Sequence, residues 1–438
     1  MSRLYNNIIG VGACATLALL TAACAIEPPL HLHDDITFDW DDAPEIDLDI
    51  DVMWDYKIDY EYEYNWKNYW IYGWDQTDVY QFGEIGYPEP SDAIFNIYRY
   101  YTGWTQNGPH NSAPIRNQIK GNTFTGQYMY GYLDMLIYNE PDETDGAQNT
   151  RIEEVGYDYV RAYTGPTMYS TLHPSSFSKY AYNQPEALFS AYEKGIAIPD
   201  PGDDYANYGF VWDGERNRWV KHLNATLLPV TYIYLVQIVL VNNKGRVTAI
   251  DGNANLTGMA YDVNLCSRIT GTNSIADYYL MRLKKNKDYG LSLSGSYPNK
   301  FATYIGEKDS ATNEMKPVTY TDEPVDVIGG KVMTFGICGL DPVSFSSRST
   351  SAYAESVRRI NELDIAQHFV EIPLQFFNGE SRTYSFDVTD QVRMLYKGGV
   401  ITVVIDVAHL PIPDPPGPNS GFDATVEDMK QEMHEIEM

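Results

Sequence analysis

The chain is poor in positive charge. Its 438 residues include 60 acidic but only 31 basic side chains, so its net charge is −29. The deficit is local, because residues 24–215 carry a net charge of −25 and residues 216–410 carry +1. A field of this sign does not attract nucleic acid or an anionic bilayer, so functions that depend on such attraction are excluded.

The chain also lacks the short motifs that organise common active sites. It has no Gly-x-Ser-x-Gly elbow, no phosphate-binding Gly-Lys-Ser/Thr loop and no His-Glu-x-x-His pair. His31 and His33 have metal-like spacing beside two aspartates, but the solvated stretch around them would not fix a ligand geometry. Sixty acids always offer carboxylate pairs, so a carboxylate-based hydrolase is the alternative. We predict a protein that is not an enzyme, with no catalytic residue, no metal and no cofactor.

Cysteine is scarce, with four in the chain, and the first 24 residues hold two of them. Arg3 precedes an apolar stretch from Ile8 to Leu20, and small residues then lead to Cys24. This order is typical of a secretory signal over residues 1–23. The cysteine directly after the small residues makes it resemble a bacterial lipoprotein signal, which implies lipidation of Cys24 and stable anchoring by two or three acyl chains. An ordinary secretory leader and an N-terminal membrane helix are the alternatives, although the stretch is shorter than the ~20 residues that span a bilayer.

Only Cys266 and Cys338 remain in the folded part of the chain. They could form a disulfide in an oxidising compartment, or both could be buried thiols, and their spacing does not decide between these alternatives.

Residues 24–44 contain prolines and many aspartates and predict an acidic tether. From Ile46 to Trp54, apolar side chains alternate with aspartates, which indicates a half-buried strand. A second alternation at 60–67 suggests a hairpin with the first. The aspartate face could bind cations or a basic partner, or it could keep a first strand soluble and prevent edge pairing.

The rest of the chain predicts many short strands separated by Gly-rich and Pro-rich turns. Strands are expected at 94–101, 123–132, 133–138, 231–241, 246–251, 331–338, 369–377, 382–388 and 400–407. The turn at 242–245 predicts a hairpin of 231–241 with 246–251, and Asn378-Gly379 predicts one of 369–377 with 382–388. The longest apolar run, 227–241, is too short to cross a membrane and indicates a buried strand or strand pair. Pro185 to Lys194 reads as a short helix, with Pro185 at its start and Gly195 after its end. A weaker helix is expected at 351–363.

These elements predict an all-β fold: two antiparallel, transthyretin-like β-sandwich domains in tandem with a short linking helix. The boundary is placed near residue 215, where the charge density drops. The expected parts are an acidic, aromatic-rich sandwich at 45–215, a second sandwich at 216–410, and a Pro-rich acidic tail at 411–438.

Aromatic residues are concentrated in the first quarter of the chain, which holds six of the eight tryptophans. They could fill the core and the cross-strand pairs of a small sandwich, or form a platform that stacks on sugar rings. The candidate platform consists of Trp66, Trp70, Trp74 and Trp104. Separately, Asp309-Ser310-Ala311 resembles the O-glycosylation acceptor of exported Bacteroidales proteins, which makes Ser310 a candidate modification site.

Several segments make the chain resemble a lipoprotein family of Bacteroidales known only as a domain of unknown function. They are Leu48 to Val52, Tyr64 to Trp66, Arg99 to Gly103, Arg393 to Val403, and the closing Ser420 to Met438. More remotely, the architecture is similar to the fimbrillin superfamily, whose members include shaft, tip and anchor subunits of type V pili. Shaft subunits of that superfamily are trimmed after an arginine behind the first strand. Here the first arginine after Cys24 is Arg99, and a cut there would remove the first predicted strands.

The resemblance therefore implies a permanently lipidated anchor or accessory subunit of a fimbria, which acts by lipid tethering and protein docking. The alternative is a surface lipoprotein that binds glycans by Tyr/Trp stacking. The expected partners are the membrane, other envelope or fimbrial proteins and, in the alternative, glycans, but not nucleic acid. The expected location is the outer membrane, on its periplasmic face or at the cell surface.

Overall fold

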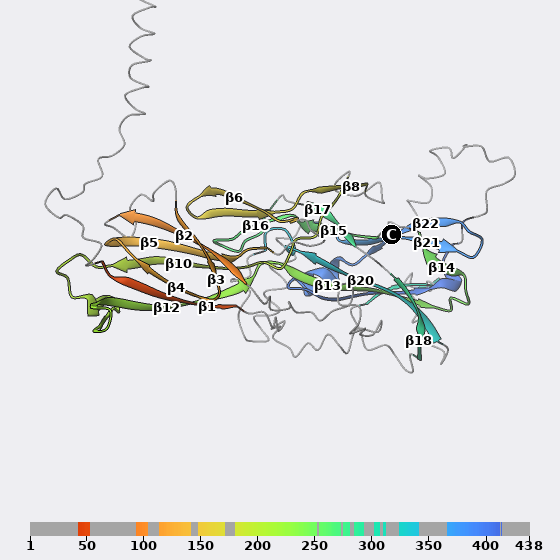
Figure 1. Ribbon diagram of the computed structural model, residues 1–438. Coiled ribbons are helices and arrows are strands. Elements are labelled where there is room, and N and C mark those ends of the chain that lie inside the picture. The colour runs from red at the N-terminus through yellow and green to blue at the C-terminus, as the bar shows by residue number, and fades with distance from the viewer. Residues whose placement is uncertain are drawn as a thin grey trace, which may run out of the picture.

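The computed structural model describes residues 43–52, 93–103, 114–141, 148–170, 180–251, 254–272, 275–280, 284–292, 302–306, 310–311, 324–340, 366–411 and 413 (Figure 1). The leader, most of the tether, the second alternation at 60–67, the helix expected at 351–363 and nearly all of the tail lie outside these residues. Within them the regular structure is almost entirely strand, so the all-β class is confirmed.

The first half of the molecule is built on an eight-stranded sheet, in the order β3-β2-β5-β10-β12-β1-β4 with β11 beside β12. Its strands are β1 (Glu45–Val52), β2 (Ile94–Gly103), β3 (Ile115–Lys120), β4 (Thr123–Gln127), β5 (Gly131–Asn139), β10 (Phe189–Ile198), β11 (Val211–Asp213) and β12 (Arg218–Pro229). β3 and β4 stand at opposite ends of this order, yet only Gly121 and Asn122 join them. The sheet must therefore fold back on itself, and its two layers enclose Ile46, Leu48, Phe95 and Leu133.

The second half consists of two further sheets that face each other. The five-stranded sheet has the order β18-β20-β13-β23-β19, and the seven-stranded sheet has the order β14-β21-β15-β17-β9-β8 with β22 beside β21. The strands are β8 (Pro166–Ser170), β9 (Tyr180–Tyr182), β13 (Tyr232–Val241), β14 (Val247–Ile250), β15 (Ala254–Ala260), β17 (Ile275–Leu280), β18 (Lys284–Ser292), β19 (Thr303–Ile305), β20 (Pro324–Thr334), β21 (Phe369–Phe376), β22 (Ser381–Asp387) and β23 (Gly399–Asp406).

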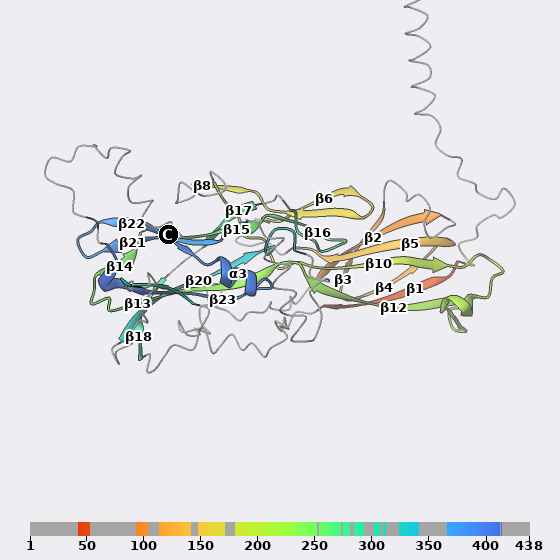
Figure 2. The ribbon, with the colours of Figure 1, turned by 180° about the vertical axis from the view of Figure 1, so that it is seen from behind.

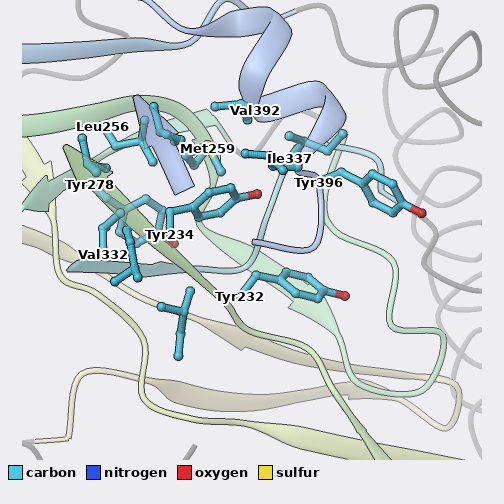
Figure 3. Close-up of a cluster of buried hydrophobic side chains, with 14 of the residues drawn as sticks. Tyr232, Tyr234, Leu256, Met259, Tyr278, Val332, Ile337, Val392 and Tyr396 are labelled. Atoms are coloured by element: carbon cyan, nitrogen blue, oxygen red, sulfur yellow. The ribbon is translucent and has the colours of Figure 1, made fainter. Parts of the chain in front are cut away.

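Side chains from the two sheets interdigitate in the core shown in Figure 3. Tyr234 and Val332 come from the five-stranded sheet and meet Leu256, Met259 and Tyr278 from the seven-stranded sheet. All of them are fully buried or nearly so, as expected of the apolar faces of two packed sheets.

A three-stranded sheet connects the two halves. It has the order β16-β7-β6, where β6 (Arg151–Gly156) and β7 (Tyr159–Tyr163) precede the predicted boundary and β16 (Asp262–Asn264) follows it. Arg161 on β7 pairs with Asp262 on β16 at 2.6 Å. A second apolar core beneath this sheet includes Val160 and Val263, so the link between the halves is packed as well as hydrogen-bonded.

The described helical elements are short: α3 (Thr389–Met394) and the 3₁₀ turns η3 (Tyr205–Tyr208) and η4 (Val407–His409). Figure 2 shows α3 beside β23. None of the described helices combines the length and the apolar composition needed to cross a bilayer.

Several strand predictions are confirmed. The alternation in β1 places Ile46, Leu48 and Ile50 in the core and its aspartates on the opposite face. β21 and β22 form the predicted hairpin around Asn378-Gly379. The apolar run at 227–241 divides into the end of β12 and the whole of β13, which are two strands in different sheets.

The prediction of a linking helix from Pro185 to Lys194 is wrong. Residues 183–188 have no regular structure, and 189–198 form β10, which pairs with β5. The signals used for a helix have other roles, since Gly195 has a φ of 64° inside a bulge of β10 rather than beyond a helix end. Pairing with β5 and burial of Phe189 in the core override the local preference.

The prediction that all strands pair antiparallel is also wrong. β1 is parallel to β12, and β13 is parallel to β23. The expected hairpin of 231–241 with 246–251 does not form, because β13 pairs with β20 and β23 while β14 pairs with β21 in the other sheet. The turn at 242–245 therefore connects two layers of the sandwich rather than two neighbours in one sheet.

The sheets do not separate at residue 215. β12 lies after that position and belongs to the first sheet, while β8 and β9 lie before it and belong to the seven-stranded sheet. A division into two tandem sandwiches at this residue remains a prediction.

Candidate functional site

Five of the predicted site residues lie outside the described part of the chain. They are the lipidation site Cys24 and the candidate platform Trp66, Trp70, Trp74 and Trp104. Their roles remain predictions.

Cys266 and Cys338 are both buried, are not joined by a disulfide, and belong to the second core beneath the three-stranded sheet. Burial raises the pKa of the Cys266 thiol to about 12, so at neutral pH it is protonated and unreactive. Of the two alternatives that the sequence left open, a disulfide or two buried thiols, the structure has two buried thiols. Ser310 lies in an exposed turn with Ala311, so a modifying enzyme could reach it, although its modification remains a prediction.

The described residues hold no cluster of three or more His, Cys, Asp or Glu side chains that could bind a metal ion. Asp134 on β5 is buried and accepts hydrogen bonds from the Tyr192 hydroxyl at 3.1 Å and the Gly195 amide at 2.8 Å. Burial and the nearby Asp134 carboxylate raise the pKa of Tyr192 well above its usual range. These bonds hold the β10 bulge against β5, which is a structural role.

The aspartate face of β1 does not lie on an edge strand, and basic side chains already pair with its first two acids. β1 is an interior strand with β12 on one side and β4 on the other, so prevention of edge pairing is not the role of these aspartates. Arg216 donates to both oxygens of Asp47, at 2.8 and 2.9 Å, and Arg218 pairs with Glu45 at 2.8 Å. Partial burial opposes ionisation of Asp47, but hydrogen bonds from Arg216 and Thr125 keep its pKa below the usual value.

These ion pairs hold the β11–β12 hairpin against β1, and beside them lies an aromatic cluster. The Tyr205 ring stacks on Trp219, with centroids 5.3 Å apart and an interplanar angle of 12°. Phe210 packs edge-on against Tyr205, and Trp212 packs edge-on against Trp219 at 5.7 Å. Tyr205 and Phe210 belong to the main core, so the cluster closes this end of the first sandwich.

Three apolar side chains of this end face solvent: Tyr208, Val211 and Trp212, which we call the apolar tip. Their exposed fractions are 36%, 64% and 49%. Lys221 donates to the Tyr208 carbonyl oxygen at 2.9 Å, and Asp204 accepts from the Ala206 amide, which fixes the backbone of the tip. An exposed group of large apolar side chains on a rigid support is typical of a contact surface.

The sequence analysis missed the apolar tip because it followed the density of tryptophans in the first quarter of the chain. Trp212 and Trp219 are the two that lie outside that quarter. The signal was the turn Asp213-Gly214 between them, since a hairpin there places the two rings opposite each other, as the register shows.

Three of the described edge strands offer little to a partner. β11 and β19 have three residues each, and β4 has five. Short, bulged or charged edges oppose the addition of a further strand. Docking by strand addition is therefore not favoured at these edges.

Arg99 lies within β2, is only 8% exposed, and its strand pairs with β3 on one side and β5 on the other. Its guanidinium donates to Asn117 at 2.6 Å and lies over the Tyr128 ring. A protease that needs an extended, accessible chain cannot reach this arginine in the folded protein.

No family model matches the chain, and no curated protein matches it either. Solved structures do resemble it. A candidate adhesin from Bacteroides ovatus has a TM-score of 0.44 at 12% identity, over 86% of this chain and 94% of that one. The fimbrial anchor protein Mfa2 from Porphyromonas gingivalis has a TM-score of 0.37 at 8% identity, over 83% and 90%.

A third similar structure is a candidate polysaccharide-binding protein from Bacteroides thetaiotaomicron, with a TM-score of 0.35 at 7% identity over 84% of this chain and 94% of that one. Bacteroidales adhesins and fimbrial proteins thus stand among the structural neighbours, as the sequence resemblance predicted. TM-scores below 0.5 are too low to transfer a function from any of them.

Proposed function

We propose that the protein is a non-catalytic lipoprotein of the cell envelope, held in the outer membrane by acyl chains on Cys24 and docked to another envelope protein. The role that fits best is an anchor or accessory subunit of a fimbria. An anchor transmits force between its lipid and its folded part. The way in which the lipid-bearing end of the chain is joined to the fold therefore decides whether the protein can act as one.

The observation that supports this role is the position of β1. The chain from Cys24 enters the fold at β1, an interior strand with eight residue pairs to β12 and five to β4. Tension on the tether acts along the strand axis and loads the hydrogen bonds of both ladders together, whereas an edge strand can be peeled off one bond at a time. A first strand held on both sides is suited to carry a load.

Burial of Arg99 supports retention of the lipid. A cut after this arginine would release β1 with the N-terminal segment, and the fold would lose the central strand of one layer. Because Arg99 is buried in a strand paired on both sides, the folded protein resists that cut and keeps its link to Cys24. The adhesin and fimbrial structures named above point the same way, but the proposal does not depend on them.

The test is metabolic labelling of the protein with a fatty-acid analogue in its own cells, followed by fractionation and co-purification. The wild-type protein is expected to take up label, sediment with outer membranes and recover a stoichiometric envelope partner. The Cys24→Ala variant should lose label and membrane association. An unlabelled wild-type protein would exclude lipid anchoring, and a labelled protein that recovers no partner would exclude the anchor role.

Glycan binding remains the alternative prediction. Its expected platform, Trp66, Trp70, Trp74 and Trp104, lies outside the described residues, so no observation of the fold favours it over docking to a protein.

A further inference from the structure

The apolar tip lies beside the point where the chain from Cys24 enters the fold. Glu45, the first residue of β1, is in register with Val220 of β12, and Val220 is in register with Val211 of β11 on its other side. Two strand spacings, or about 10 Å, therefore separate the backbone at Glu45 from Val211. Arg216 and Arg218 tie the hairpin to Glu45, so the two features share one end of the molecule.

The length of the tether limits how far this end can lie from the lipid. Nineteen residue steps separate Cys24 from Ala43, which is buried in the fold. A chain of this length reaches at most about 65 Å. A short tether of this kind holds the tip near the bilayer at an effective concentration in the millimolar range.

The chemistry of the tip suits the interfacial region of a bilayer. Tyr and Trp have an apolar ring and a polar edge, and such side chains concentrate at the level of the lipid headgroups. Tyr208 and Trp212 provide two such rings, and Val211 adds the most exposed apolar side chain of the three. The stack of Tyr205 on Trp219 supports the Trp212 ring, so little conformational entropy of this side chain is lost on contact.

The polar groups around the tip do not favour a sugar. Asp204 accepts from the Ala206 amide, and Asp213 accepts from the amides of Glu215 and Arg216. Arg216 is engaged with Asp47. The Asp213 carboxylate and the Arg216 guanidinium are thus engaged within the hairpin and with β1, whereas the side chains of the tip itself are apolar or aromatic.

We propose that Tyr208, Val211 and Trp212 insert into the interfacial region of the bilayer that holds Cys24 and fix the orientation of the fold on the membrane. This inference rests on the proposed lipidation of Cys24. Exposed Asp203, Asp204 and Glu215 surround the tip, so contact with zwitterionic lipid is favoured and an anionic surface weakens it.

The test is hydroxyl-radical labelling of the full acylated protein on phosphatidylcholine vesicles, with mass spectrometry of single residues. Labelling of Trp212 and Tyr208 is expected to fall about threefold or more relative to the unacylated Cys24→Ala variant in solution, as these side chains leave water. Met168 and Phe377 are exposed on other parts of the molecule and serve as internal controls with unchanged labelling. Vesicles with an equal share of phosphatidylglycerol should restore part of the labelling at the tip.

Flotation separates the two ways in which this experiment can fail. If the protein floats with the vesicles but Trp212 is labelled as fast as in the Cys24→Ala variant, the protein is anchored and the contact by the tip is disproved. If intact mass shows no acyl chain on Cys24 and the protein does not float, the proposed function fails first. If a soluble oligosaccharide protects Trp212 from labelling and vesicles do not, the apolar tip binds a glycan and the proposed contact with the bilayer is disproved.

Discussion

β1 in the first half of the molecule and β13 in the second occupy the same kind of ladder. Each is an interior strand with one parallel and one antiparallel neighbour, which are β12 and β4 for β1, and β23 and β20 for β13. Their side chains differ sharply. β1 alternates between buried apolar residues and acidic residues that are partly or fully exposed, whereas all ten residues of β13 are buried.

Hydrogen-bonded neighbours therefore do not decide how a strand is buried; the layers above and below it do. On β13 even the polar Gln237 is enclosed, where it donates to the Thr402 hydroxyl, and Gln391 of α3 bonds the Thr402 backbone in turn. The β1 strand of the first half keeps a solvent-exposed face that can be substituted or contact a partner, whereas β13 in the second half has no exposed face. This difference predicts how each half responds to substitution.

The largest effect is expected from an acid placed in β13, compared with a substitution of an exposed acid in β1. Val239→Asp in β13 would bury a carboxylate without a partner, at a cost of several kcal/mol, and should abolish folding. Asp49→Val in β1 changes an exposed side chain and should alter stability by no more than about 0.5 kcal/mol. Soluble yield and thermal unfolding followed by circular dichroism measure both. Equal tolerance of the two variants would refute the contrast between the strands.

Two glycines with nearly equal backbone angles provide a second comparison. Gly398 has a φ of 92°, and a Cβ there would lie 2.4 Å from the Ile233 carbonyl oxygen. Gly121, in the β3–β4 turn, has a φ of 89° and no atom within 4 Å of its Cβ position. Gly121→Ala should cost only the left-handed strain of about 1–2 kcal/mol. Gly398→Ala should cost clearly more, and chemical denaturation midpoints that coincide would contradict the close approach.

The three-stranded sheet predicts that the halves unfold together. Arg161→Met removes the partner of Asp262, which is 6% exposed, and should lower stability by about 1–3 kcal/mol. The wild-type protein should show one cooperative transition by calorimetry. Two separate transitions in the wild type would mean that β16 and β7 do not couple the halves. Glu153→Gln, next to the same arginine but more exposed, serves as the control with a smaller effect.

The smallest effect is expected on the aspartate face and depends on pH. Because the folded-state pKa of Asp47 is lowered, its contribution is present above the unfolded value of about 4 and is lost as pH falls through the folded value. Asp47→Asn should therefore flatten the loss of stability below about pH 4. Acid titration followed by fluorescence measures this, with Asp49→Asn as the control. An unchanged acid profile would show that the Arg216 contact adds nothing in solution.

The sequence predicted features that depend on local pattern. The period-two alternation of β1 identified both its core residues and its solvent face, because a one-residue slip would bury the aspartates. The Asn378-Gly379 turn predicted its hairpin for a similar reason, since a tight turn fixes the register of the strands it joins.

Features that depend on distant partners could not be predicted. β12, the parallel neighbour of β1, begins more than 160 residues after β1 ends, and nothing in either strand specifies the other. The residues around Pro185 favour a helix locally, but pairing with β5 and burial of Phe189 in the core stabilise a strand from residue 189 onward instead. The apolar tip was missed because exposure of Trp212 depends on where the β11–β12 hairpin lies, and only the fold shows that.

The parallel pairing of β1 with β12 also has a consequence for the order of events in the proposed export of the chain. With export from the N-terminus, Glu45 emerges about 175 residues before its partner Val220. Until then Ile46, Leu48 and Ile50 have no complete layer to enter, and long-range pairing of this kind folds slowly. We expect the emerging first half to require a holding chaperone, and the proposed lipid on Cys24 to be attached before β1 has paired with β12.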